Sequence, residues 1–212
     1  MAIDYAGFYA RFEAPTKKLA GILTGADTLV GDEFEVYIKV EDGVSLAWIK
    51  NRFGAEIGFF DADTTRKIQL ALARDMHVHA LLSFVAYSEA PDPGLFWGEF
   101  AIVCFKDSDA EVFQPFLSNV AAKLCEGVRT DIDLGHQDIE QLRQNPNWLP
   151  QGTIFLPETS RGSAIIKSKR TLSEKVVEQG RNRNIGCYIG TFAIFAIVIA
   201  FIVFSLHSCG VF

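Results

Sequence analysis

The feature that most constrains this chain is a long run near its C-terminal end that carries no charge. No Asp, Glu, Lys or Arg occurs in residues 184–212. Residues 185–206 are almost all apolar or small, and as an α-helix they would extend about 33 Å, which matches a hydrocarbon core of about 30 Å. Lipid offers a peptide backbone no hydrogen-bond partner, so a single segment within it must be helical. The run therefore predicts one C-terminal transmembrane helix at residues 185–206, followed by a short tail at 207–212.

The charges that precede this run predict its orientation. Residues 161–183 carry seven basic and two acidic side chains, whereas the 160 residues before them carry 13 basic and 24 acidic ones. The positive-inside rule places such a basic flank, and the body before it, in the cytoplasm. No signal peptide is visible at the N-terminus. We therefore expect a tail-anchored, single-pass membrane protein with a cytosolic domain, and the membrane-flanking basic residues are Lys167, Lys169, Arg170, Lys175, Arg181 and Arg183.

The C-terminal region also suggests partners. The bilayer itself is the first, and the basic flank could hold anionic lipid headgroups. Gly186 and Gly190 have the GxxxG spacing that lets two helices approach closely, so they are candidate contacts for a homodimer through the membrane helix. The alternative is that small residues are simply common in such spans. Because the body is acidic and phosphate contacts need clustered Lys and Arg, nucleic acid is not an expected partner.

The body predicts an α+β domain at residues 1–156 and a basic linker with a short helix at 157–184. Residues 33–40 alternate apolar and polar side chains, and Asp42 and Gly43 then form a hairpin signal. Aromatic residues within 5–12 have helical spacing, so a short helix is expected there. The remaining strands are expected at 44–50, 55–60, 77–87 and 95–105, and further helices at 61–75, 108–126 and 137–144. We predict a mainly antiparallel sheet of four or five strands with helices packed on it, followed by the membrane helix.

The motifs of common enzyme classes are absent. The chain has no GxGxxG, no GxxxxGK followed by Ser or Thr, no HExxH and no GxSxG. We therefore expect no cofactor and no resident metal, and an interaction module rather than an enzyme. His77 and His79 lie two apart on an expected strand and so share one face, but two imidazoles need at least one further ligand to hold a metal.

Two other groups of residues are candidates for function. Asp131 and Asp133 could form a carboxylate pair, although a solvated loop is the simpler interpretation. Trp48 and Trp97 are expected in the core. Trp148, between Asn-Pro and Leu-Pro dipeptides, is the best candidate of the three for an exposed binding surface.

One stretch resembles a known family. Residues 54–87, which read GAEIGFFDADTTRKIQLALARDMHVHALLSFVAY, are similar to the core of HIRAN domains, in which an Ile-Gly-aromatic strand precedes a helix and a further strand. The resemblance covers residues 54–105 at most. It implies a small β-barrel-like module of the kind that binds single-stranded DNA ends, and it carries over no individual functional residue.

Three functions follow from these observations. The first is a tail-anchored, non-catalytic interaction module that binds an unknown protein partner. The second is a HIRAN-like nucleic-acid-binding domain tethered to the membrane. The third is an enzyme whose site is assembled from distant residues such as His77 and His79. We favour the first, because a compact acidic domain, a basic linker and one apolar span occur without any catalytic motif.

Overall fold

The computed structural model describes residues 4–41, 43–181, 197 and 199 of the 212-residue chain. The chain divides into two compact units, Met1–Arg170 and Thr171–Phe212. The described strands, all in the first unit, are β1 (Tyr5–Ala14), β2 (Glu33–Glu41), β3 (Val44–Lys50), β4 (Glu56–Phe60), β5 (His77–Ser88), β6 (Leu95–Phe105) and β7 (Ser163–Lys167). The first unit's helices are α1 (Lys17–Thr24), α2 (Ala62–Leu72), α3 (Ala110–Glu126) and α4 (His136–Gln144), and the described helix of the second unit is α5 (Leu172–Arg181).

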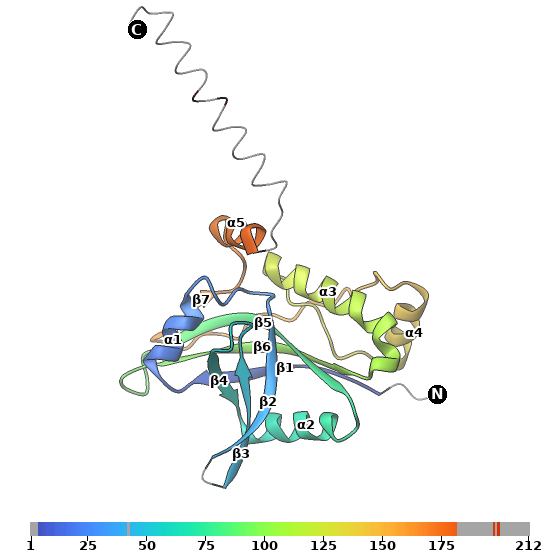
Figure 1. Ribbon diagram of the computed structural model, residues 1–212, viewed down its shortest axis with the longest axis horizontal. Coiled ribbons are helices and arrows are strands. Elements are labelled where there is room, and N and C mark those ends of the chain that lie inside the picture. Colours follow the sequence, from blue (N-terminus) through green and yellow to red (C-terminus); the bar gives the residue numbers. More distant parts are fainter. Residues whose placement is uncertain (1–3, 42, 182–196, 198, 200–212) are drawn as a thin grey trace, which may run out of the picture. The chain divides into compact units, whose positions relative to one another are not determined.

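Six of the strands form a closed antiparallel β-barrel (Figure 1). Hydrogen-bonded neighbours follow the order β2-β3-β4-β1-β6-β5, and β2 then pairs with β5 through Glu33 with Leu81 and Phe34 with Ala80. β7 is a seventh strand that pairs with residues 85–88 of β5, beyond the part of β5 that meets β2. Closure leaves fewer unpaired strand edges than an open sheet would.

β5 and β6 are apolar on both faces because each separates two hydrophobic cores. On the inner face, Leu82, Phe100 and Ile102 are fully buried within the barrel. On the outer face, Leu81 and Val103 belong to a second core that also contains the buried side of α3. Figure 1 shows α3 and α4 lying against the outside of the barrel. The wall formed by β5 and β6 therefore supports this helical layer.

Helix α2 packs against the barrel and occupies residues 62–72 of the helix expected at 61–75. Asp61 caps its N-terminus, since its Oδ1 accepts a hydrogen bond from the Thr64 N–H at 2.7 Å. Ile68 and Ala71 of α2 belong to the barrel core. At the other helical layer, Gly127 adopts a φ of 86° and ends α3 in the left-handed conformation that glycine tolerates best.

The prediction of a sheet of four or five strands was wrong, because the sheet has seven strands and six of them close into a barrel. The five expected strands are present as β2 to β6, but residues 5–14 form β1 rather than a helix, and β7 adds a seventh strand. β1 has apolar side chains on both faces because Phe12 points into the barrel core, whereas Tyr5 packs in the outer core. A strand that is covered on both sides loses the strict alternation that identifies a half-buried strand. The domain is thus a β-barrel with surrounding helices, not an open α+β sheet.

The predicted membrane helix also requires correction. Among the residues that the structure describes, no helix is long and apolar enough to cross a membrane. The longest of these, α3, carries Glu111 and Lys123 and packs on the barrel through one face. Residues 185–206, to which the prediction applied, lie outside the described residues except for Ile197 and Ile199. The described fold therefore does not include the single-pass, tail-anchored architecture that the sequence predicted.

Candidate functional site

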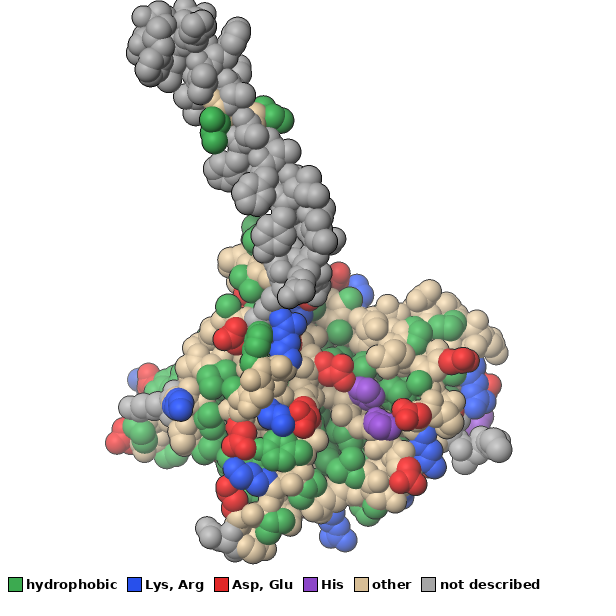
Figure 2. Space-filling view, in the orientation of Figure 1, with side chains coloured by type: hydrophobic (Ala, Val, Ile, Leu, Met, Phe, Trp, Pro, Cys, Tyr) green, Lys and Arg blue, Asp and Glu red, His purple; other side chains and the backbone are tan. Residues whose placement is uncertain are grey.

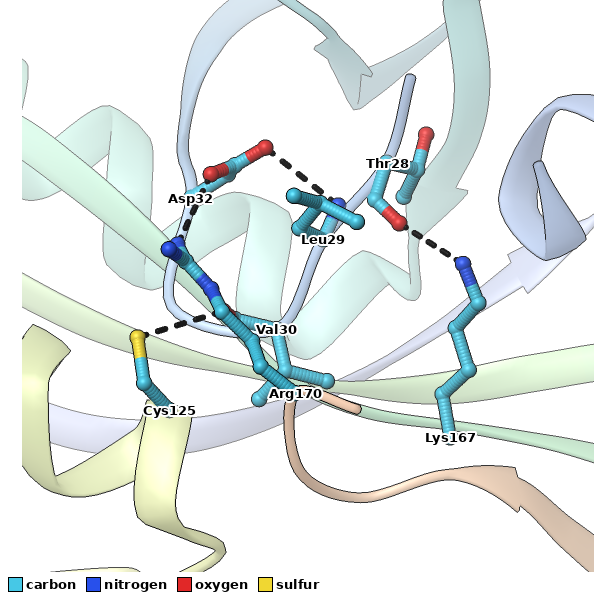
Figure 3. A network of polar contacts seen from close by, with 7 residues as sticks. All are labelled: Thr28, Leu29, Val30, Asp32, Cys125, Lys167 and Arg170. Atoms are coloured by element: carbon cyan, nitrogen blue, oxygen red, sulfur yellow. Dashed lines mark hydrogen bonds and ion pairs between the residues drawn. The ribbon is translucent and has the colours of Figure 1, made fainter. Parts of the chain in front are cut away.

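Lys167 and Arg170, two of the six basic residues singled out in the sequence, form hydrogen bonds to the loop between α1 and β2 (Figure 3). Arg170 donates from Nε to the Val30 carbonyl oxygen at 2.6 Å, and its Nη2 lies 2.9 Å from Oδ1 of Asp32. The side chains of this ion pair are only 6% and 13% exposed. Lys167 donates from Nζ to the carbonyl oxygens of Gly25 and Thr28, at 2.7 and 2.9 Å. We call this arrangement the C-terminal clasp, formed by Lys167, Arg170, Asp32 and the carbonyls of Gly25, Thr28 and Val30.

Helix α3 also contributes to the clasp. The Cys125 thiol donates to the Val30 carbonyl oxygen at 3.5 Å, and the Cys125 carbonyl oxygen accepts from the Arg170 N–H at 3.0 Å. The clasp therefore joins three segments that are far apart in sequence, and it extends the first unit to Arg170, beyond the expected domain boundary at residue 156.

The other predicted basic residues and the helix-contact glycines are placed less fully. Lys169 and Lys175 are exposed, Lys175 on α5. Arg181 is the last residue of α5, and its side chain lies outside the described part of the structure. Arg183, Gly186 and Gly190 lie outside the described residues altogether. Their suggested roles beside and within a membrane helix are untested.

His77 and His79 each approach a carboxylate from another part of the chain. Nε2 of His77 lies 3.1 Å from Oδ2 of Asp107, and Nδ1 of His79 lies 2.6 Å from Oε1 of Glu33. The His79 ring also stacks on Phe105, with ring centroids 4.6 Å apart. In Figure 2, histidines lie beside acidic side chains on the face in view. No cluster of three or more His, Cys, Asp or Glu in the described part of the chain could hold a metal ion.

A cleft that the sequence did not indicate lies on the outside of the β1–β6 wall. Its volume is about 380 Å³, and two segments that follow α3 and α4 form its other sides. We call it the Arg129 cleft. The residues that line it are Gly7, Phe8, Tyr9, Glu99, Arg129, Asp131, Ile132, Asp133, Ile154, Phe155 and Pro157.

Arg129 is the central charged group of this cleft. Its side chain is 5% exposed and forms an ion pair with Glu99 of β6. The guanidinium also lies over the ring of Tyr9, 4.3 Å from the centroid, and donates from Nη1 to the Phe155 carbonyl oxygen at 2.7 Å. Its buried Nε has no hydrogen-bond partner among the described residues. The ion pair, the ring contact and the hydrogen bond from Nη1 stabilise the buried guanidinium, because desolvating an isolated charge is strongly unfavourable.

Arg129 fixes the backbone of a segment whose side chains are exposed. Besides the bond to the Phe155 carbonyl, the Ile154 N–H donates to the Arg129 carbonyl oxygen at 2.8 Å, and Thr130 forms a β-bridge with Thr153. The Phe155 side chain is nevertheless 88% exposed and that of Ile154 is 38% exposed. Two adjacent apolar side chains are thus held at the surface by an ordered backbone.

The opposite side of the cleft depends on two tyrosines and a glycine of β1. Tyr5 donates to the Ile132 carbonyl oxygen at 2.7 Å, and Tyr9 donates to that of Thr130 at 2.8 Å. Burial raises the pKa of the Tyr9 phenol above its ordinary value, although the nearby guanidinium opposes the effect, so the phenol remains a donor. A Cβ on Gly7 would overlap the Ile132 carbonyl oxygen. The absence of a side chain at Gly7 therefore permits this close approach.

The structure places the other sequence candidates at or near this cleft or in the core. Asp131 and Asp133 lie in the cleft lining, where Oδ1 of Asp131 accepts from the Asp133 N–H at 3.0 Å. Trp48 and Trp97 are buried as expected, but Trp148 is half-buried against the core beneath α3 and α4. Among the described aromatic side chains, Phe155 is the most exposed, at 88%.

Sequence reasoning missed Glu99, Arg129 and Phe155, although each carries a signal. Glu99 interrupts an otherwise apolar strand, which indicates either an exposed position or a buried partner. Phe155 stands in a segment bounded by Pro150 and Pro157, where an apolar residue has no regular element to bury it. Only the fold brings these residues to Arg129.

Comparison with known proteins does not assign the chain to a group. No family model matches it, and neither the curated proteins nor the solved structures include a match. The resemblance of residues 54–105 to HIRAN domains therefore stays a prediction. What the fold and the cleft define is a closed β-barrel with a cleft that contains both charged side chains and exposed apolar ones.

Proposed function

We propose that the barrel is a non-catalytic protein-interaction module and that the Arg129 cleft, together with Ile154 and Phe155, is its docking surface. The observation that carries this proposal is the contrast at Phe155. Its side chain is 88% exposed, yet a buried and ion-paired arginine holds its carbonyl oxygen at 2.7 Å.

Energetics support this interpretation of Phe155. Complete burial of a phenylalanine side chain contributes about 1.5–3 kcal/mol, which the unbound protein does not gain at this position. Aromatic side chains often supply much of the binding energy in interfaces, and an ordered backbone reduces the entropy lost on association. An anchored, exposed phenylalanine is therefore suited to bind an apolar pocket on a partner.

The chemistry of the cleft favours binding of a protein over binding of nucleic acid and over catalysis. Three carboxylates, from Glu99, Asp131 and Asp133, line it against one guanidinium, so a phosphate backbone would be repelled. Glu99 is engaged by Arg129, and the Tyr9 hydroxyl by the Thr130 carbonyl oxygen. These engagements make both groups poor candidates for proton transfer to a substrate.

Photocrosslinking tests the proposal. Phe155 is replaced by the photoreactive residue p-benzoyl-L-phenylalanine in the full-length chain, and irradiation in the cells that produce the protein should give a discrete crosslinked product. The matched control carries the same residue in place of Phe53, which is 58% exposed in the turn between β3 and β4. A product that forms from position 155 and not from position 53 supports the proposal. No discrete product at 155, or the same products from both positions, would refute it.

A further inference from the structure

We infer that the partner inserts a single Lys or Arg side chain into the Arg129 cleft and places an apolar residue beside it against Phe155. This inference rests on the proposed function and specifies the partner's chemistry. It is drawn from the charges, the dimensions and the unsatisfied donor of the cleft.

The charge of the cleft favours a cation. Glu99 is paired with Arg129, which leaves the carboxylates of Asp131 and Asp133. Neither aspartate forms an ion pair with another residue in the part of the chain that the structure describes. The first 160 residues also carry 13 basic and 24 acidic side chains, so the surrounding field attracts cations and repels anions.

The cleft has enough room and a suitable lining for one long basic side chain. Its volume is about 380 Å³, and Ile154, Phe155 and Pro157 provide apolar surface on one side. Lys and Arg combine an apolar stem with a charged head, so the stem can lie on such a surface while the head reaches carboxylates. The exposed ring of Phe155 can add a cation–π contact.

Arg129 provides a further, independent indication of an incoming group. Its side chain is 5% exposed, and its Nε donor has no partner among the described residues although it is buried at the cleft. An unsatisfied buried donor is unfavourable, because it has lost its water and gained no acceptor. A backbone carbonyl oxygen that enters with the partner's basic residue would supply the missing acceptor.

Binding of short peptides to the full-length protein tests the inference. The probes are fluorescent peptides with one arginine flanked by leucines, and the same peptides with neutral citrulline or with glutamate in place of the arginine. Fluorescence anisotropy should show that the arginine peptide binds about tenfold more tightly than the citrulline peptide and that its affinity falls as salt is added.

A pair of double variants locates the effect. Asp131→Asn with Asp133→Asn removes both charges but keeps an oxygen at position 131 for the Asp133 backbone, so the turn should persist. The matched control, Asp63→Asn with Glu111→Gln, removes the same charge from exposed positions on α2 and α3. The preference for arginine over citrulline should disappear in the first variant and remain in the second.

Other outcomes overturn the inference. It is wrong if no arginine peptide binds, if citrulline or glutamate peptides bind the unmodified protein equally well, or if the preference for arginine survives in the Asp131 and Asp133 variant. Because crosslinking at position 155 does not depend on the charge of the partner, a product there with no arginine preference would refute only this inference. The proposed docking surface would then stand with a different partner chemistry.

Discussion

At the scale of single residues, the Arg129 cleft depends on how closely two backbones approach each other. The segment at Ile132 lies directly over β1 at Gly7, where even a methyl group would overlap the Ile132 carbonyl oxygen. Tyr5 donates to that same oxygen at 2.7 Å and so holds the two segments together. A side chain at position 7 would separate them and open the cleft.

Gly7→Ala should therefore lower the free energy of unfolding by about 1–3 kcal/mol, the usual range for an extra methyl group in a packed site. Gly21→Ala is the matched control, because a Cβ at that position in α1 meets nothing within 4 Å. It should instead stabilise the protein by about 0.5–1 kcal/mol, since alanine favours a helix more than glycine does. Urea denaturation measures both changes, and equal midpoints for Gly7→Ala and the unmodified protein would contradict the proposed contact.

Only some residues of the candidate site could be predicted from the sequence. Asp131 and Asp133 could be selected as a carboxylate pair because they are close in sequence. The ion pair between Glu99 and Arg129 could not be predicted, because 30 residues separate them and either side chain alone is compatible with an exposed position. Exposure of Phe155 could not be predicted either, because Trp148 and Leu149 of the same connecting segment pack against the outer core whereas Phe155 does not, and only the tertiary structure distinguishes them.

At the scale of elements, local patterns identified strands and helices but not their closure into a barrel. The alternation at residues 33–40 is a local signal, and β2 occurs where that signal lies; the helices expected at 61–75 and 108–126 likewise occur as α2 and α3. β1 was misread because Phe12 and Tyr5 face two different cores. Closure rests on pairs such as Glu33 with Leu81, which are distant in sequence and leave no periodic trace.

The clasp shows the same dependence on distant contacts and yields a second prediction. Arg170→Met should lower the free energy of unfolding by about 3–5 kcal/mol, because the largely buried Asp32 carboxylate loses its guanidinium. Adding Asp32→Asn should recover part of this loss. The control Lys169→Met alters an exposed neighbour and should change stability by less than about 0.5 kcal/mol.

Hydrogen exchange of the β7 amides, together with urea denaturation, measures this effect. Faster exchange in β7 is expected for Arg170→Met, since the clasp holds the chain directly after that strand. An Arg170→Met variant that matches the Lys169→Met control in both measurements would show that the clasp does not stabilise the barrel.

At the scale of the whole molecule, the first unit needs its last segment to be complete. β7 pairs with the half of β5 that β2 does not reach, and Ile165 of β7 packs with Leu156 against a small core of Phe84, Ala86 and Trp97. Without β7, this half of β5 would present an unpaired edge, and unpaired edges promote aggregation. The compact unit should therefore end after the clasp and not before β7.

Two truncations distinguish these boundaries. A chain that ends at Thr171 keeps β7 and the clasp and should unfold in one cooperative thermal transition. A chain that ends at Glu158 lacks both, so its melting temperature should be at least about 10 °C lower, given a loss of about 3–5 kcal/mol in a domain of this size. Circular dichroism and gel filtration measure stability and aggregation. Equal melting temperatures would mean that the barrel is complete without β7, and that the bonds of Lys167 and Arg170 only attach the C-terminal segment to it.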